Sequence, residues 1–258
     1  MLSISICLTK IPGSTAKRQQ KFPTLEQIKH VLSKMPVGNE IERRNRALVT
    51  FTLLTGARDS AIASLKLKHV DLVAGCVNQD AREVKTKFSK TFSTFFFPVG
   101  EEVLEIVVAW VAYLRNEKLR GNDDPLFPAT RVALGPDRQF AAEGLKREHW
   151  SNASPIRTIF REAFFGAGLP YFNPHSFRNT LVHLGEKVCK TPEQFKAWSQ
   201  NLGHEKVLTT FLCYGEIEGH RQGEIIRNLV RPQKAVPSDA DEIAEAVYKK
   251  LRSSGMEV

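Results

Sequence analysis

The sequence predicts a mainly α-helical fold with a small antiparallel β-sheet, and three observations support this fold class. Helix-capping patterns recur along the chain, whereas β-branched and aromatic residues concentrate in one stretch, residues 77–99. The hydrophobic share of 42% in 258 residues is enough to bury a sizeable core in one large or two small domains. No internal repeat or low-complexity tract interrupts the pattern.

Two helices are expected before Gly56. The sequence "TLEQ" at residues 24–27 matches a capping box, which predicts a helix running to about Lys34. In residues 40–55 the apolar side chains at helical spacing, which should lie near one face, are Ile41, Leu48, Phe51 and Leu54. Gly56 is a natural stop for that helix, and a short helix is expected around residues 60–67.

The later elements follow from similar signals. Residues 77–99 are expected to form strands joined by polar turns, and residues 101–117 an amphipathic helix. A loop rich in Gly, Asp and Pro leads to a helix that begins at Ser154. Three more helices are expected: one from about Pro174, one capped by Thr191 and stopped by Gly203, and an amphipathic one after a Pro-containing linker at 230–237.

Charge and cysteine usage narrow the function classes. Lys and Arg number 37 against 28 Asp and Glu, so the formal net charge of +9 indicates a polyanionic partner, with nucleic acid first. No uninterrupted apolar run approaches the roughly 20 residues that span a bilayer. The four cysteines form no CxxC pair, which argues against a zinc knuckle or disulfide framework and favours a reducing compartment: Cys7, Cys76, Cys189 and Cys213.

Several basic groups and one tyrosine could act together on a phosphate. His175 and Arg178 are three residues apart at a predicted helix start, so both can face an anion that the helix amino end also attracts. Taken singly, each candidate has an ordinary reading: Arg58 as an ion-pair partner of Asp59, His175 as a helix cap, Tyr214 as a packed ring. The same segments lack clustered carboxylates, which argues against a metal-dependent nuclease.

The order of these residues resembles that in a known family. Arg58, a lysine of the hairpin "VKTKFSK", the motif "HSFR", the motif "LGH" and Tyr214 together resemble the catalytic domain of the tyrosine recombinases, the phage integrase family. The resemblance extends from about Phe22 to Ile217. It implies a site-specific DNA recombinase (integrase) of a mobile element that cleaves and rejoins double-stranded DNA through a 3′-phosphotyrosyl link, without metal or cofactor, in the cytoplasm at the nucleoid.

The resemblance also implies a role for each residue. Tyr214 would attack the scissile phosphate, Arg58 and Arg178 would hold its nonbridging oxygens, His175 would manage the tyrosine proton, and His204 would donate a hydrogen bond. Lys87 would protonate the leaving oxygen, because Lys87 and Lys90 have the spacing of the family's hairpin lysine and its follower. A shift of strand register would give that role to Lys85.

The match has two local departures. Ala61 stands where many family members have an acidic residue, with Asp59 adjacent to Arg58 instead. Tyr214 lies ten residues after His204, one more than is usual, which implies a bulge or extra turn.

The domain and assembly predictions also rest on the resemblance. Residues 1–21 are expected to be a linker or the remnant of an amino-terminal DNA-binding domain, 22–230 the catalytic domain, and 231–258 a linker and carboxy-terminal helix. A homotetramer on paired DNA sites is expected, with a monomer possible without DNA, and the last helix docks either in trans or in cis. The alternatives are a type IB topoisomerase-like activity and a catalytically silent DNA-binding module.

Overall fold

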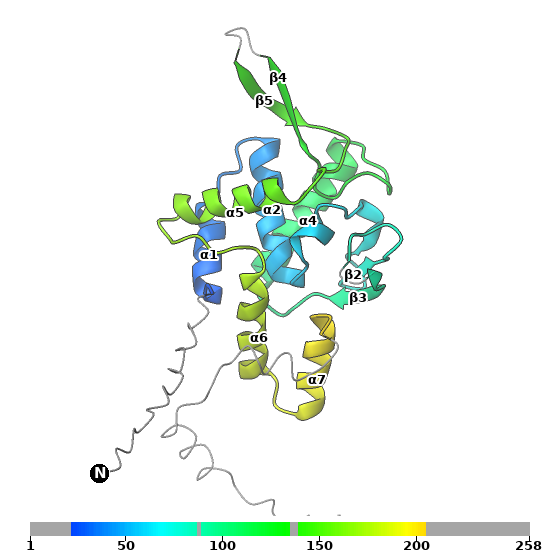
Figure 1. The fold of residues 1–258 in the computed structure, drawn as a ribbon, viewed down its shortest axis with the longest axis vertical. Coiled ribbons are helices and arrows are strands. Elements are labelled where there is room, and N and C mark those ends of the chain that lie inside the picture. Colours follow the sequence, from blue (N-terminus) through cyan, green and yellow to red (C-terminus); the bar gives the residue numbers. More distant parts are fainter. Residues whose placement is uncertain (1–21, 87–88, 135–138, 205–258) are drawn as a thin grey trace, which may run out of the picture. The chain divides into compact units, whose positions relative to one another are not determined.

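The computed structural model describes residues 22–86, 89–134 and 139–204 (Figure 1). The chain divides into two compact units, residues 1–215 and 216–258, and every described residue belongs to the first. Lys87, Tyr214, the expected carboxy-terminal helix and residues 1–21 lie outside the described residues. Their structure therefore stays a prediction, as do the domain boundaries.

The first two helices begin and end where the sequence indicates. Helix α1, Leu25–Lys34, starts with a capping box in which Thr24 and Gln27 exchange hydrogen bonds of 3.2 and 2.9 Å. Helix α2, Glu40–Thr55, has a second capping box at its start and ends at Gly56, whose φ of 61° is left-handed.

Helix α2 forms the centre of the core. Every side chain from Ala47 to Thr55 is buried, so this half of the helix is surrounded by protein on all sides and not only on the expected apolar face. Buried threonines are tolerated because each hydroxyl donates to the carbonyl four residues earlier, as from Thr52 to Leu48 at 2.9 Å. Helices α4, α5 and α6 pack around α2.

A three-stranded antiparallel sheet, ordered β1-β2-β3, follows α2 in the chain. Its strands are β1, Val70–Asp71, β2, Cys76–Gln79, and β3, Phe92–Phe95. Val77 lies opposite Thr94. The single expected helix around residues 60–67 is replaced by two shorter pieces, α3 at Asp59–Ile62 and a 3-10 turn at Leu67–His69.

The structure contains a second antiparallel pair besides the one small sheet that was expected. Strands β4, Thr130–Leu134, and β5, Phe140–Leu145, form a hairpin in the region expected to be a loop, and it extends away from the helices (Figure 1). Most of its side chains are exposed on both faces, including Val132 and Phe140. A ribbon exposed on both sides has no alternation of apolar and polar residues to reveal it.

The remaining helices confirm their predicted starts. Helix α4, Glu101–Ala112, continues as a short π-helical turn, Tyr113–Glu117, and α5, Ser154–Gly166, has proline in its first turn. Helix α6 covers Ser176–Val188, and α7, Pro192–Asn201, starts with a capping box from Thr191. None of the helices in the described ranges is long and apolar enough to cross a membrane.

Candidate active site

Arg178 lies in the first turn of α6 and joins three segments of the chain. Its side chain is buried, with 5% exposed. Nη1 donates to the carbonyl oxygen of Gly56 at 2.6 Å, and Nη2 donates to the carbonyl oxygen of Leu202. The end of α2, the start of α6 and the turn after α7 are therefore fixed around one guanidinium.

Gly56 is required by this arrangement. Its φ of 61° disfavours any residue with a Cβ, and a Cβ there would lie 3.0 Å from Leu181 Cδ1 and 3.1 Å from Leu202 Cδ2. The chain reverses at this glycine and places Arg58 two residues later, immediately before α3. The glycine stop predicted from the sequence thus also determines where Arg58 lies.

The Arg58 guanidinium is available to a ligand. The pairing of Arg58 with Asp59 considered from the sequence does not occur, because Asp59 Oδ2 binds Arg157 Nε at 2.9 Å and Oδ1 accepts from the Ser60 amide. Among the described residues, no carboxylate forms an ion pair with Arg58. Partial burial lowers the pKa of Arg58, but a guanidinium remains a cation at neutral pH.

His204 follows Gly203, whose φ of 69° turns the chain after α7. The amide of His204 donates to the carbonyl of Ser199 at 3.1 Å, which fixes its backbone. Burial, followed by the positive charges of Arg178, Arg58 and His175, lowers the pKa of His204 to about 4. His204 is therefore neutral at pH 7, and all four side chains share one electrostatic environment.

His175 precedes α6 and is exposed at its amino end. It makes no side-chain cap, so the capping role considered from the sequence is wrong, and Asn173 Oδ1 accepts from the Ser176 amide at 3.0 Å instead. The imidazole therefore stands beside the partial positive charge of the helix start. An anion is favoured at this helix start, and a bound anion would in turn favour transfer of a proton to the imidazole.

The structure brings four of the six predicted site residues together and leaves two outside the described residues. Arg58, His175, Arg178 and His204 converge from separate segments. Lys87 and Tyr214 are not described. Lys85, the alternative to Lys87, is exposed, and its amide donates to Ser64 Oγ at 2.9 Å, which holds its backbone beside α3.

One contact that positions the site had no signal in the sequence. The side-chain amide of Asn201, at the end of α7, accepts from the Phe95 amide at 2.7 Å and donates to the Phe95 carbonyl at 2.9 Å. It thereby pairs with the edge of β3 and ties the turn that contains His204 to the sheet. An asparagine before a glycine stop predicts only a helix end.

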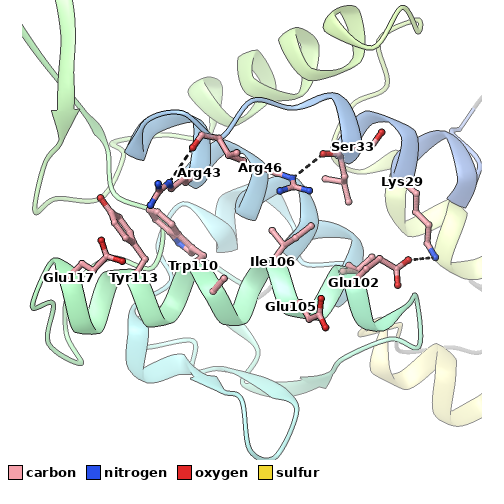
Figure 2. A pocket seen from close by; sticks show the side chains of 14 residues that line it. Lys29, Ser33, Arg43, Arg46, Glu102, Glu105, Ile106, Trp110, Tyr113 and Glu117 are labelled. Carbon is pink, nitrogen blue, oxygen red and sulfur yellow. Dashed lines mark hydrogen bonds and ion pairs between the residues drawn. The ribbon is translucent and has the colours of Figure 1, made fainter.

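The site does not coincide with the pocket that lies between α1, α2 and α4. This pocket has a volume of about 750 Å³, with the Lys29–Glu102 ion pair of 2.7 Å at one end (Figure 2). None of the candidate residues lines it. Within the described ranges, no group of three His, Cys, Asp or Glu side chains could hold a metal ion.

Comparison with known proteins decides the family. The model of the phage integrase family matches residues 21–217, which is most of the chain and includes all six predicted site residues. The chain belongs to the phage integrase family. The fold class and the resemblance predicted from the sequence are thereby confirmed.

Curated relatives and solved structures agree with this assignment. Tyrosine recombinase XerC of Lactobacillus leichmannii is 26% identical over 201 residues, which cover 75% of this chain and 58% of that protein. Tyrosine recombinase XerD of Pasteurella multocida is 25% identical over 194 residues, covering 75% and 57%. The chain thus spans little more than half the length of these relatives.

The structural similarity concerns the fold. The XerA recombinase superposes with a TM-score of 0.55 at 18% identity, covering 86% of this chain and 68% of that chain. A lambda integrase (75–356) dimer bound to a COC′ core site gives 0.52 at 15% identity, covering 86% and 65%.

Proposed function

We propose that this chain is a site-specific tyrosine recombinase that cleaves and rejoins double-stranded DNA through Tyr214. The observation that supports this most is the convergence of Arg58, His175, Arg178 and His204, where burial and then the neighbouring positive charges lower the pKa of His204 to about 4. A cluster of cationic groups with a neutral imidazole favours binding of an anion. The order of these residues in a member of the phage integrase family supports a DNA phosphodiester as that anion.

The cleavage step follows from the chemistry of these groups. The Tyr214 oxygen attacks the scissile phosphorus, the bond from phosphorus to the 5′ oxygen breaks, and a 3′-phosphotyrosyl bond forms. The tyrosine proton passes to His175, and a loop lysine, Lys87 or its alternative Lys85, gives a proton to the leaving 5′ oxygen. Ligation is the reverse step with the 5′ hydroxyl of another strand, so no external energy source is needed.

The site residues also stabilise the transition state. Arg58 and Arg178 bind the nonbridging oxygens, where negative charge increases during the attack. The contacts of Arg178 with the Gly56 and Leu202 carbonyls fix its guanidinium before DNA binds. His204, neutral because of its lowered pKa, donates a hydrogen bond without adding another cation.

The proposal includes an assembly and a location. Two copies of the chain bind one site, and four assemble on two paired sites, with the carboxy-terminal helix of residues 231–258 docking in trans or in cis. Residues 22–230 act as the catalytic domain, and residues 1–21 as a linker. The net charge of +9 favours DNA as partner, and we place the protein in the cytoplasm at the nucleoid. A transposon integrase, that of Tn1549, is among the similar folds, at a TM-score of 0.51, and a mobile element is the proposed source of the chain.

Two other functions use the same fold. A type IB topoisomerase-like enzyme would form the same phosphotyrosyl bond but would relax DNA without a defined, paired site. A catalytically silent module would bind DNA and form no covalent bond. Formation of a covalent bond to DNA distinguishes a recombinase from the silent module. The requirement for a defined DNA sequence distinguishes it from the topoisomerase.

The test uses duplexes of random sequence with a nick in one strand, so that cleavage near the nick releases a short oligonucleotide and traps the protein on DNA. The protein is incubated with this pool in EDTA, and covalent complexes are recovered by denaturing electrophoresis and sequenced. We expect a covalent adduct in which one DNA sequence is enriched over the random pool. A nicked duplex of that sequence is then synthesised and serves as the defined substrate. Absence of any adduct would contradict the proposal, and relaxation of plasmids that lack the enriched sequence would favour the topoisomerase.

A further inference from the structure

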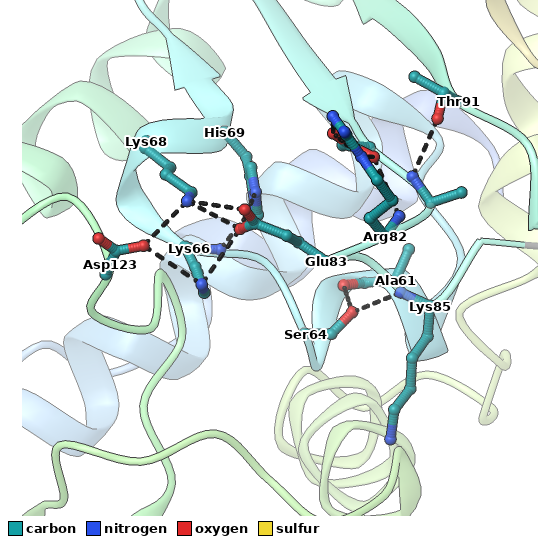
Figure 3. Close-up of polar contacts among 12 residues, drawn as sticks. Ala61, Ser64, Lys66, Lys68, His69, Arg82, Glu83, Lys85, Thr91 and Asp123 are labelled. Atoms are coloured by element: carbon teal, nitrogen blue, oxygen red, sulfur yellow. Dashed lines mark hydrogen bonds and ion pairs between the residues drawn. The ribbon is translucent and has the colours of Figure 1, made fainter.

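The loop between β2 and β3, which contains Lys85 and Lys87, is fixed near its start by a network of ion pairs (Figure 3). Glu83 is the loop residue at its centre. Its carboxylate lies 3.1 Å from Lys66 Nζ, 2.9 Å from Lys68 Nζ and 3.3 Å from His69 Nε2. All three partners come from the segment that follows α3.

The protonation states in this network are well defined. The lysine ammonium groups lower the pKa of Glu83 to about 2, so its carboxylate is ionised at neutral pH. His69 Nδ1 accepts a hydrogen bond from the Lys66 amide at 3.0 Å, which places the proton of the neutral ring on Nε2, facing Glu83. His69 is buried, and this burial lowers its pKa. Glu83 thus pairs with two ammonium groups and lies close to an imidazole N–H, all from the segment of residues 66–69.

The two residues after Glu83 are also fixed. Val84 is buried in the core. The Lys85 amide donates to Ser64 Oγ at 2.9 Å, and Ser64 Oγ in turn donates to the Ala61 carbonyl at 3.0 Å. The Lys85 side chain extends away from the ion pairs (Figure 3). The backbone at Lys85 is therefore held, through Ser64, against α3, the helix that begins directly after Arg58.

We propose that Glu83 is a positioning residue for the loop lysine that protonates the leaving oxygen. This inference rests on the proposed function. A general acid must bring its proton within hydrogen-bond distance of the leaving atom, and the flexible lysine side chain does this only if its backbone is fixed. Glu83 contributes to that fixation, because its ion pairs tie the start of the loop to the segment that follows α3.

The chain offers a matched control in Asp123. Its carboxylate lies 3.2 Å from Lys66 Nζ and 2.9 Å from Lys68 Nζ, so it pairs with the same two lysines as Glu83 (Figure 3). Asp123 belongs to the turn at residues 121–124, which is a different segment of the chain from the lysine loop. Loss of Asp123 therefore removes similar ion pairs without releasing the loop.

The experiment compares single-turnover cleavage of two substrates by the wild type, Glu83→Ala and Asp123→Ala. One substrate is the defined nicked duplex, and the other has sulfur in place of the bridging 5′ oxygen, which leaves without a proton. We expect Glu83→Ala to cleave the oxygen substrate about 10- to 100-fold more slowly than the wild type, as a misplaced catalytic group does. It should cleave the sulfur substrate at about the wild-type rate, and Asp123→Ala should match the wild type on both.

A role of Glu83 in folding alone would slow both substrates equally, and that result would overturn the inference. Unchanged cleavage of the oxygen substrate by Glu83→Ala would overturn it too. Glu83→Gln, which keeps the size of the side chain, gives the same comparison if the alanine variant does not fold. If the wild type forms no adduct with any nicked duplex, the proposed function fails and this inference fails with it, whereas a wild-type adduct without sulfur rescue refutes the inference alone.

Discussion

The guanidinium of Arg178 donates a 2.6 Å hydrogen bond to the carbonyl of Gly56, which lies 122 residues earlier in the chain. A side chain proposed to bind phosphate therefore also fixes the turn that places Arg58. Arg58 has no comparable structural contact among the described residues. Replacing Arg178 should consequently lower the stability of the fold more than replacing Arg58, whereas both replacements should slow DNA cleavage.

Arg178→Ala should lower the free energy of unfolding by about 1–3 kcal/mol, because it leaves the buried carbonyls of Gly56 and Leu202 without their donor. Arg58→Ala should leave that free energy nearly unchanged. Both variants should cleave the nicked duplex slower by about 100-fold or more, since each loses a charge partner of the transition state. Urea unfolding and single-turnover cleavage measure the two effects. Wild-type cleavage by both variants would refute the site.

Gly56→Ala should destabilise the protein because alanine is strained at a φ of 61° and its Cβ would meet Leu181 and Leu202. We expect a loss of about 1–3 kcal/mol, combining left-handed strain with crowding. For a chain of this size each kcal/mol lowers the melting temperature by roughly 2–4 °C.

Gly166→Ala is the matched control for that substitution, since nothing lies within 4 Å of a Cβ at Gly166. It lies at the end of α5, where alanine is favoured over glycine. Thermal unfolding of both variants should show a lower melting temperature for Gly56→Ala only. Equal melting temperatures would contradict the packing described for this turn.

The lowered pKa of His204 predicts a pH dependence of stability. The unfolded chain protonates His204 near its ordinary pKa of 6.5 and the folded chain only near about 4, so between these values the unfolded state binds more protons. The stability that the protein has with a neutral His204 is therefore fully present above pH 6.5 and is lost progressively as the pH falls to about 4. His204→Gln, which cannot titrate, should lose less stability than the wild type between pH 7 and pH 5. Parallel losses in urea unfolding would refute the shift.

The identity of the general acid can be tested by the leaving group. We expect Lys87→Ala to be slow on the oxygen substrate and restored on the sulfur substrate, while Arg178→Ala remains slow on both, because sulfur replaces only the need for a proton. Rescue of Lys85→Ala in place of Lys87→Ala would assign the acid to Lys85. If the sulfur substrate restores neither Lys87→Ala nor Lys85→Ala, the general acid is not a lysine of this loop.

Local signals in the sequence predicted most helices, whereas contacts between distant residues could not be predicted. Capping boxes at Thr24 and Thr191 and the stop at Gly56 depend on neighbours within a few residues, so their patterns are visible in the sequence. The β4–β5 hairpin escaped notice because both of its faces are largely exposed.

The site shows the same division. Its residue types were expected from the resemblance, but the pairing of Asp59 with Arg157, 98 residues away, has no local sign. Glu83, Lys66 and Lys68 look like ordinary surface charges in the sequence, and only the folded chain brings them together. The contact of Arg178 with Gly56 is equally invisible before folding.

The central claim is that Tyr214 forms the covalent bond to DNA, and Tyr214→Phe tests it most directly because it removes only the attacking oxygen. The measurement is denaturing electrophoresis of the wild type and the variant after incubation with the defined nicked duplex, with binding followed by gel shift. We predict an adduct with the wild type, none with Tyr214→Phe, and similar binding for both. A covalent adduct of Tyr214→Phe would contradict the account.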